Sequence, residues 1–91
     1  MSKIILKGFI VVSDEDLQAV EGELPTHTKL TLDEEGCLTF KVTKSDSNPN
    51  RFDVYEEFVD RDAFNKHQNR VKSSHWGDVT INVERHYEII E

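Results

Sequence analysis

Three side chains of this sequence have the chemistry of a proton-transfer site and occur where the local pattern directs them inward. His67 lies between Phe64 and Val71 on the apolar stripe of a predicted helix, so its ring is expected to face a sheet. A histidine in that position either packs against the core with one bond to a backbone carbonyl, or acts as a general base, because imidazole titrates near neutral pH. The pattern leaves both interpretations open.

Two further groups could act together with His67. His27 belongs to the inward stripe of an earlier predicted helix and could meet His67 across a cavity, or it could bond a carbonyl at a helix end. Glu56 interrupts the apolar parity of a predicted strand, where a carboxyl group must be paired or have a raised pKa. Arg85 has the right charge to pair with it. The candidate catalytic residues are therefore His67, His27 and Glu56.

Aromatic side chains near these groups suggest a planar ligand. Trp76 and Tyr87 offer flat surfaces, although a tryptophan directly after a helix more often closes the end of a core. Together with Arg85 and Phe64 they form the predicted substrate-binding set.

The sequence does not predict a metal or an organic cofactor. His67 and His75 are eight residues apart, which turns their rings away from each other on a helix, and no Cys or His pair has zinc-ligand spacing. There is no glycine-rich phosphate loop, no nucleophile elbow and no flavin motif, and Cys37 has no cationic neighbour in the sequence that would activate it. We therefore expect chemistry without a metal or a cofactor.

The periodicity of apolar residues predicts one α+β domain over residues 1–91. The expected order is strand, helix, strand, strand, helix, strand, with an antiparallel sheet; the strands are expected at residues 3–12, 37–43, 51–59 and 78–90. Helices are expected to begin after Ser13 and Asp60, with a break at Pro25 and with Gly77 helping to end the second helical segment. Two helices cover one sheet face only, so the apolar residues on the other face predict a homodimer.

Charge and cysteine content limit the partners and the compartment. Eighteen acidic and eleven basic residues give a formal net charge of −7, which disfavours nucleic acid and anionic membranes as partners. The single Cys37 and the absence of a signal-peptide pattern in "MSKIILKGF" predict a cytoplasmic protein.

Three segments together resemble the antibiotic biosynthesis monooxygenase family, which includes proposed quinol monooxygenases. They are "LPTHTKLTLDEEGCLTFKV", "NPNRFDVYEEFVDRDAFNKHQ" and "SHWGDVTINVERHYEI", and the resemblance runs from Gly8 to Ile89. It implies a ferredoxin-like βαββαβ subunit that pairs into a dimeric α+β barrel. It also implies a cofactor-independent oxygenase that removes a proton from a quinol or polyphenol, after which the anion passes an electron to dioxygen. The implied pocket lies near His67, with Trp76 and Tyr87 as walls.

The sequence also departs from its relatives. Leu32 and Glu35 replace an arginine and a proline of the motif that reads "TLDEEGC" here. Related haem-degrading enzymes have an asparagine where Gly8 stands and a tryptophan on the second helix, so haem degradation is not expected. Two alternatives are an isomerase of a phosphorylated autoinducer-type sugar, which another branch of the family implies, and a non-catalytic dimer that binds a small molecule.

Overall fold

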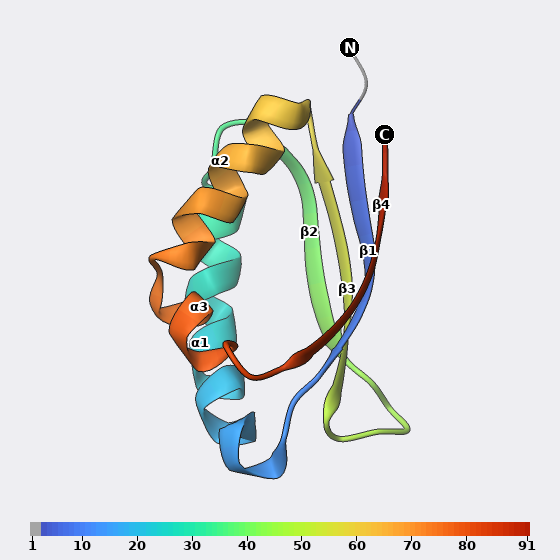
Figure 1. Ribbon diagram of the computed structural model, residues 1–91, viewed down its shortest axis with the longest axis vertical. Coiled ribbons are helices and arrows are strands. Elements are labelled where there is room, and N and C mark those ends of the chain that lie inside the picture. The colour runs from blue at the N-terminus through green and yellow to red at the C-terminus, as the bar shows by residue number, and fades with distance from the viewer. Residues whose placement is uncertain (1–2) are drawn as a thin grey trace.

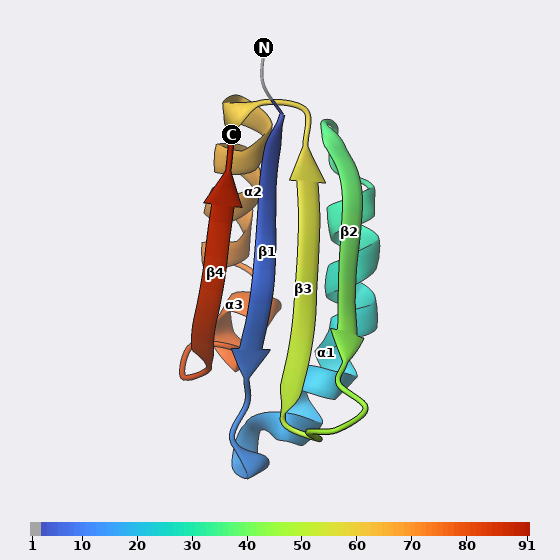
Figure 2. The same ribbon diagram turned by 90° about the vertical axis from the view of Figure 1, so that its right-hand side faces the viewer.

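The computed structural model describes residues 3–91 as one layer of helices packed on one antiparallel sheet (Figure 1). The elements are β1 (Ile4–Val11), α1 (Asp14–Leu32), β2 (Cys37–Lys44), β3 (Arg51–Phe58), α2 (Arg61–Lys72), α3 (His75–Val79) and β4 (Glu84–Ile90). The sheet has the strand order β2-β3-β1-β4 (Figure 2). The predicted ferredoxin-like α+β fold is confirmed, with one short helix more than expected. No helix within residues 3–91 combines the length and the apolar character that crossing a bilayer requires.

All helices cover the same face of the sheet (Figure 1). Alternate residues of β1 and β3 point toward them and are nearly fully buried, among them Ile4, Leu6, Phe52 and Phe58. The opposite sheet face has no helix over it, as the count of helices predicted. There the Phe9 ring stacks on His86 at a centroid distance of 4.6 Å, and the Arg51 guanidinium lies 3.8 Å from the centre of the Phe9 ring.

The predicted break at Pro25 is wrong. Helix α1 runs without interruption from Asp14 to Leu32 with Pro25 inside it. A proline in a helix removes the bond to the carbonyl four residues earlier, which belongs to Glu21. Glu21 is exposed, so water can solvate that carbonyl and the helix continues.

The prediction of a closing strand from Asp78 is also wrong in its first half. Residues 75–79 form α3 instead, because the Ser74 hydroxyl accepts a hydrogen bond from the Gly77 N–H at 3.1 Å and caps that helix. Gly77 therefore lies inside α3 and does not end α2. A Cβ at Gly77 would lie 2.2 Å from the Val71 carbonyl oxygen, so only glycine lets α3 approach the end of α2 this closely. Strand β4 begins at Glu84.

Gly8 has a comparable role between β1 and β4. It pairs with Tyr87 across the two strands and has a φ of +150°, a backbone conformation that favours glycine. A Cβ at this position would lie 1.9 Å from the His86 carbonyl oxygen. Gly8 therefore allows β4 to lie against β1, and this contact fixes where the side chains of β4 point.

We predict that Gly8→Ala lowers the free energy of unfolding by roughly 1–3 kcal/mol, because the added methyl group meets backbone that cannot move aside cheaply. Gly22→Ala is the matched control. Gly22 lies in α1 with nothing within 4 Å of its would-be Cβ, so the same change should stabilise the protein by about 0.5–1 kcal/mol. Urea unfolding of both variants measures the difference. Equal effects in the two variants would contradict this account of Gly8.

Candidate functional site

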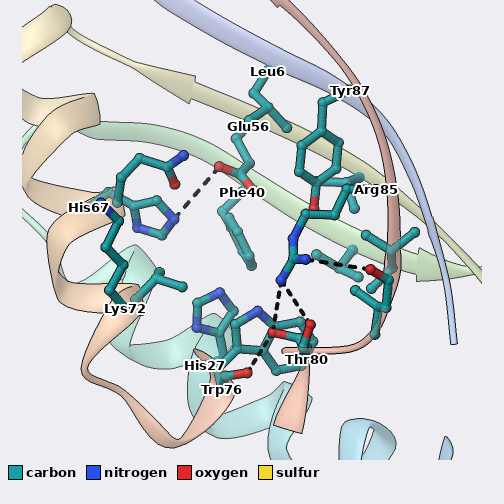
Figure 3. A pocket seen from close by; sticks show the side chains of 16 residues that line it. Leu6, His27, Phe40, Glu56, His67, Lys72, Trp76, Thr80, Arg85 and Tyr87 are labelled. Carbon is teal, nitrogen blue, oxygen red and sulfur yellow. Dashed lines mark hydrogen bonds and ion pairs between the residues drawn. The ribbon is translucent and has the colours of Figure 1, made fainter. Parts of the chain in front are cut away.

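A cavity of about 280 Å³ lies between the helices and the inner face of the sheet (Figure 3). Every predicted catalytic residue contributes to its lining, and so do three of the four predicted substrate-binding residues. Phe64 is the exception, because it packs in the core with its ring 5.7 Å from that of Phe58. The lining residues among these predictions are His27, Glu56, His67, Trp76, Arg85 and Tyr87.

His67 is oriented by a carboxylate outside the cavity. Its side chain is 3 % exposed, and its Nδ1 lies 3.0 and 3.2 Å from the two oxygens of Glu34. Because a carboxylate accepts, Nδ1 carries the hydrogen and donates it, so Nε2 has the free lone pair. Nε2 is directed toward Glu56 on the cavity wall, at 3.7 Å from Oε1 (Figure 3).

Glu34 is held in turn by α2 and α1. The Arg70 guanidinium forms an ion pair with Glu34 through Nε and donates through Nη2 to the Thr31 hydroxyl at 3.0 Å. Thr31 is fully buried. Glu34, Arg70 and Thr31 are not among the site residues predicted from the sequence. One signal was available, because Arg70 follows His67 by three residues and so shares its face of α2.

Glu56 faces the cavity, as the strand parity predicted, and is 7 % exposed. Burial, together with the nearby Glu34 carboxylate, raises the pKa of its carboxyl group to about 8. Glu56 is therefore protonated at neutral pH. Its contact with His67 at 3.7 Å is too long for a hydrogen bond and is not an ion pair. Within residues 3–91, Oε1 of Glu56 has no hydrogen-bond partner.

His27 forms an aromatic wall together with Trp76. The two rings are parallel within 4° at a centroid distance of 4.5 Å, and the His27 ring lies 5.9 Å from that of His67. Burial, together with the nearby His67 and Arg70, lowers the pKa of His27 to about 3. The imidazole of His27 is therefore neutral and a weak base.

Strand β4 supplies the opposite edge of the cavity. Arg85 pairs with Ile10 in the strand register, which places it on the helix-covered side of the sheet, and Tyr87 follows on the same side. Arg85 does not pair with Glu56, the partner that the sequence suggested. Its Nη2 donates to the Thr80 carbonyl oxygen at 2.8 Å (Figure 3).

The donor set of the described chain does not form a metal site. Within residues 3–91, no group of three or more His, Cys, Asp or Glu side chains converges in an arrangement that could hold a metal ion.

Comparison with known proteins assigns this chain to a family. The profile of the antibiotic biosynthesis monooxygenase family matches residues 4–78, most of the 91 residues of the chain. The chain belongs to this family. The match includes His27, Glu34, Glu56, His67 and Trp76, and it ends before Arg85 and Tyr87.

Solved structures of similar proteins have the same fold. A conserved protein of unknown function from Bacteroides thetaiotaomicron, suggested to be an oxidoreductase, is 22% identical with a TM-score of 0.79, covering 98% of this chain and 96% of its own. A proposed antibiotic biosynthesis monooxygenase from Nitrosomonas europaea is 17% identical with a TM-score of 0.78, covering 98% and 94%. A third, from Deinococcus radiodurans, is 21% identical with a TM-score of 0.76, covering 97% and 90%. A comparison with curated proteins finds no match.

Because Glu56 is buried, we expect its contribution to the free energy of unfolding to fall as pH rises. Its folded pKa of about 8 lies above the ordinary value of 4.5, so between these values the folded chain binds more protons than the unfolded chain. The contribution of Glu56 is complete below about pH 4.5 and is lost as pH rises toward 8.

We predict that Glu56→Gln, which cannot ionise, gains stability relative to the parent protein by roughly 3 kcal/mol between pH 5 and pH 8. Urea unfolding of both proteins at several pH values across this interval tests it. The shared titration of all other groups cancels in the difference. A difference that stays constant with pH would show that Glu56 is already ionised in the fold.

Proposed function

We propose that this chain is a cofactor-independent monooxygenase that oxidises an electron-rich aromatic, a quinol or a polyphenol, with His67 as its general base. Family membership supports chemistry of the monooxygenase type. The observation that carries the proposal is the orientation of His67, whose Nδ1 is bonded to Glu34 while Nε2 faces the cavity.

The charge states of the three candidate bases favour His67. Glu56 already holds a proton at neutral pH, and His27 has a pKa of about 3 and is too weak a base. Burial also lowers the pKa of His67, but the Glu34 carboxylate opposes this effect. His67 is therefore neutral before the reaction, and Glu34 stabilises the imidazolium that forms when Nε2 takes the phenolic proton.

The oxidation then needs no further reductant. The phenolate passes one electron to dioxygen, and the resulting aryloxyl radical and superoxide combine into a ring-bound peroxide that takes up a proton. Loss of water from this hydroperoxide leaves one oxygen atom on the ring, which becomes a quinone. The substrate supplies all four electrons, so one oxygen atom of dioxygen enters the product and the other leaves as water.

The remaining wall residues suit a planar and electron-rich ring. Trp76 and His27 present a stacked pair of flat rings, and Phe40 contacts His27 edge-on at a centroid distance of 5.3 Å. Because Glu56 is uncharged, it does not repel a phenolate, and its proton can be donated to an oxygen of the substrate.

We predict that His67→Gln lowers the rate of oxygen consumption with a responsive hydroquinone by about 10²–10⁴-fold, the usual cost of losing a general base. His75→Gln is the matched control, because His75 is exposed and lies outside the cavity lining. Oxygen-electrode assays with a panel of hydroquinones are run beside thermal melts. If the parent turns over a hydroquinone, and His67→Gln has the same melting temperature and the same rate of oxygen consumption, His67 is not the base.

Glu34→Gln extends the same experiment. Glu34 acts through His67 and does not line the cavity, so it is a positioning residue. Removing its charge should lower the pKa of His67 further and move the acidic limb of the pH–rate profile to lower pH. A loss of stability without such a movement would indicate a purely structural role.

We also propose that the protein is a homodimer, because one sheet face has no helix over it and carries Phe9 and Ile5. Light scattering during gel filtration should give twice the monomer mass of 10.6 kDa at micromolar concentration. A mass of one subunit would refute the dimer and leave that face exposed to solvent.

A second candidate function is an isomerase of a phosphorylated sugar. The protonated Glu56 and the basic His67 lie 3.7 Å apart, an arrangement that also suits moving a proton between two carbons of one substrate. Such an enzyme would consume no oxygen. A non-catalytic binding dimer would show neither activity while still binding a ligand.

A further inference from the structure

Arg85 differs from the other arginines of the chain in its partners. Within residues 3–91, Arg51, Arg61 and Arg70 each form an ion pair with a carboxylate, whereas Arg85 has none. Its hydrogen-bond acceptors are the carbonyl oxygen and hydroxyl of Thr80, at 2.8 and 3.5 Å, and the Val83 carbonyl oxygen at 3.5 Å. All of these acceptors are neutral, so the charge of Arg85 is not compensated by the protein.

The cavity that Arg85 borders has the opposite charge character from the chain as a whole. The formal net charge of the protein is −7, yet the cavity lining contains two cations, Arg85 and Lys72, and one carboxyl group, Glu56. Lys72 has no ion pair within the described part of the chain, and Glu56 is uncharged at neutral pH. Arg85 and Lys72 would therefore attract an anion inside the cavity, and no charged carboxylate of the lining would repel it.

The guanidinium is also held in place. Thr80, which accepts from Nη2, is 2 % exposed, and its own hydroxyl donates to the Trp76 carbonyl oxygen at 2.7 Å. Figure 3 shows Arg85 on one side of the cavity beside Tyr87, with His67 on the other. A fixed guanidinium with unused N–H groups binds a carboxylate through two parallel hydrogen bonds.

We propose that the aromatic substrate carries a carboxylate that Arg85 binds, with the reacting hydroxyl, meta to this carboxylate on the ring, beside His67. The proposal rests on the proposed oxidation of an aromatic ring and names the class of substrate. The volume of about 280 Å³ is at the small end of ligand sites and suits a single ring with few substituents.

Binding can be measured without turnover, because Trp76 is the only tryptophan of the chain and lines the cavity. Quenching of its fluorescence gives the dissociation constants of gentisate, a hydroquinone with one ring carboxylate, and of its neutral methyl ester. We expect the parent protein to bind gentisate at least about 10-fold more tightly than the ester, since hydrogen bonds to a charged group are the stronger ones. Arg85→Gln should abolish this preference, and Arg85→Lys should restore part of it.

Arg61→Gln is the control variant. It removes the same charge from α2 outside the cavity lining and should keep the preference for gentisate. Thermal melts establish that each variant is folded. An unchanged preference in Arg85→Gln, or equal binding of acid and ester by the parent, would overturn the proposal. If phenyl phosphate binds more tightly than gentisate and this binding depends on Arg85, the group that Arg85 recognises is a phosphate. That result would also overturn the proposal.

Oxygen consumption separates this inference from the proposed function. Arg85-dependent binding of gentisate without oxygen consumption would reject the oxygenase and retain the carboxylate site. Oxygen consumption with neutral hydroquinones, without any preference for the acid, would reject the carboxylate site and retain the oxygenase.

Discussion

The contact between Glu34 and His67 is the interaction on which the site depends. Glu34 lies in the turn between α1 and β2, and His67 lies on α2, so the 3.0 Å bond joins the two long helices above the sheet. Arg70 supplies the countercharge that a carboxylate in this partly buried position needs. The bond also assigns the hydrogen of the imidazole to Nδ1, which leaves the lone pair of Nε2 facing the cavity for the proposed proton transfer.

Burial of Glu56 is a second constraint, and it acts against stability. A carboxyl group with a pKa of about 8 in a core destabilises the fold whenever pH rises, and an amide of the same shape would avoid this effect. Functional sites commonly retain such costs because the group has a chemical role. In the proposed mechanism this role is to hold a proton 3.7 Å from His67, the proposed base.

Periodicity predicted the inward residues and failed for those outside regular elements. The strand parity identified Glu56, and the helical stripes identified His67 and His27, because each of these follows from a fixed angle per residue. Glu34 is in a turn and has no period, so its contact with His67 depends on how α1 and α2 pack. Pro25 and the start of β4 were mispredicted for a related reason: solvent at Glu21 and the cap at Ser74 decide them, and neither leaves a periodic signal.

The two sides of the cavity differ in how they relate to the family. The proposed base His67, its partner Glu34 and the aromatic wall lie within residues 4–78, the segment that the family profile matches, whereas Arg85 and Tyr87 lie beyond it. Gly8 connects the two sides, because its missing side chain lets β4 pair with β1 and brings Arg85 to the cavity. In the proposed mechanism the matched segment supplies the base and β4 supplies the group that selects the substrate, so the reaction type and the substrate preference depend on different parts of the chain.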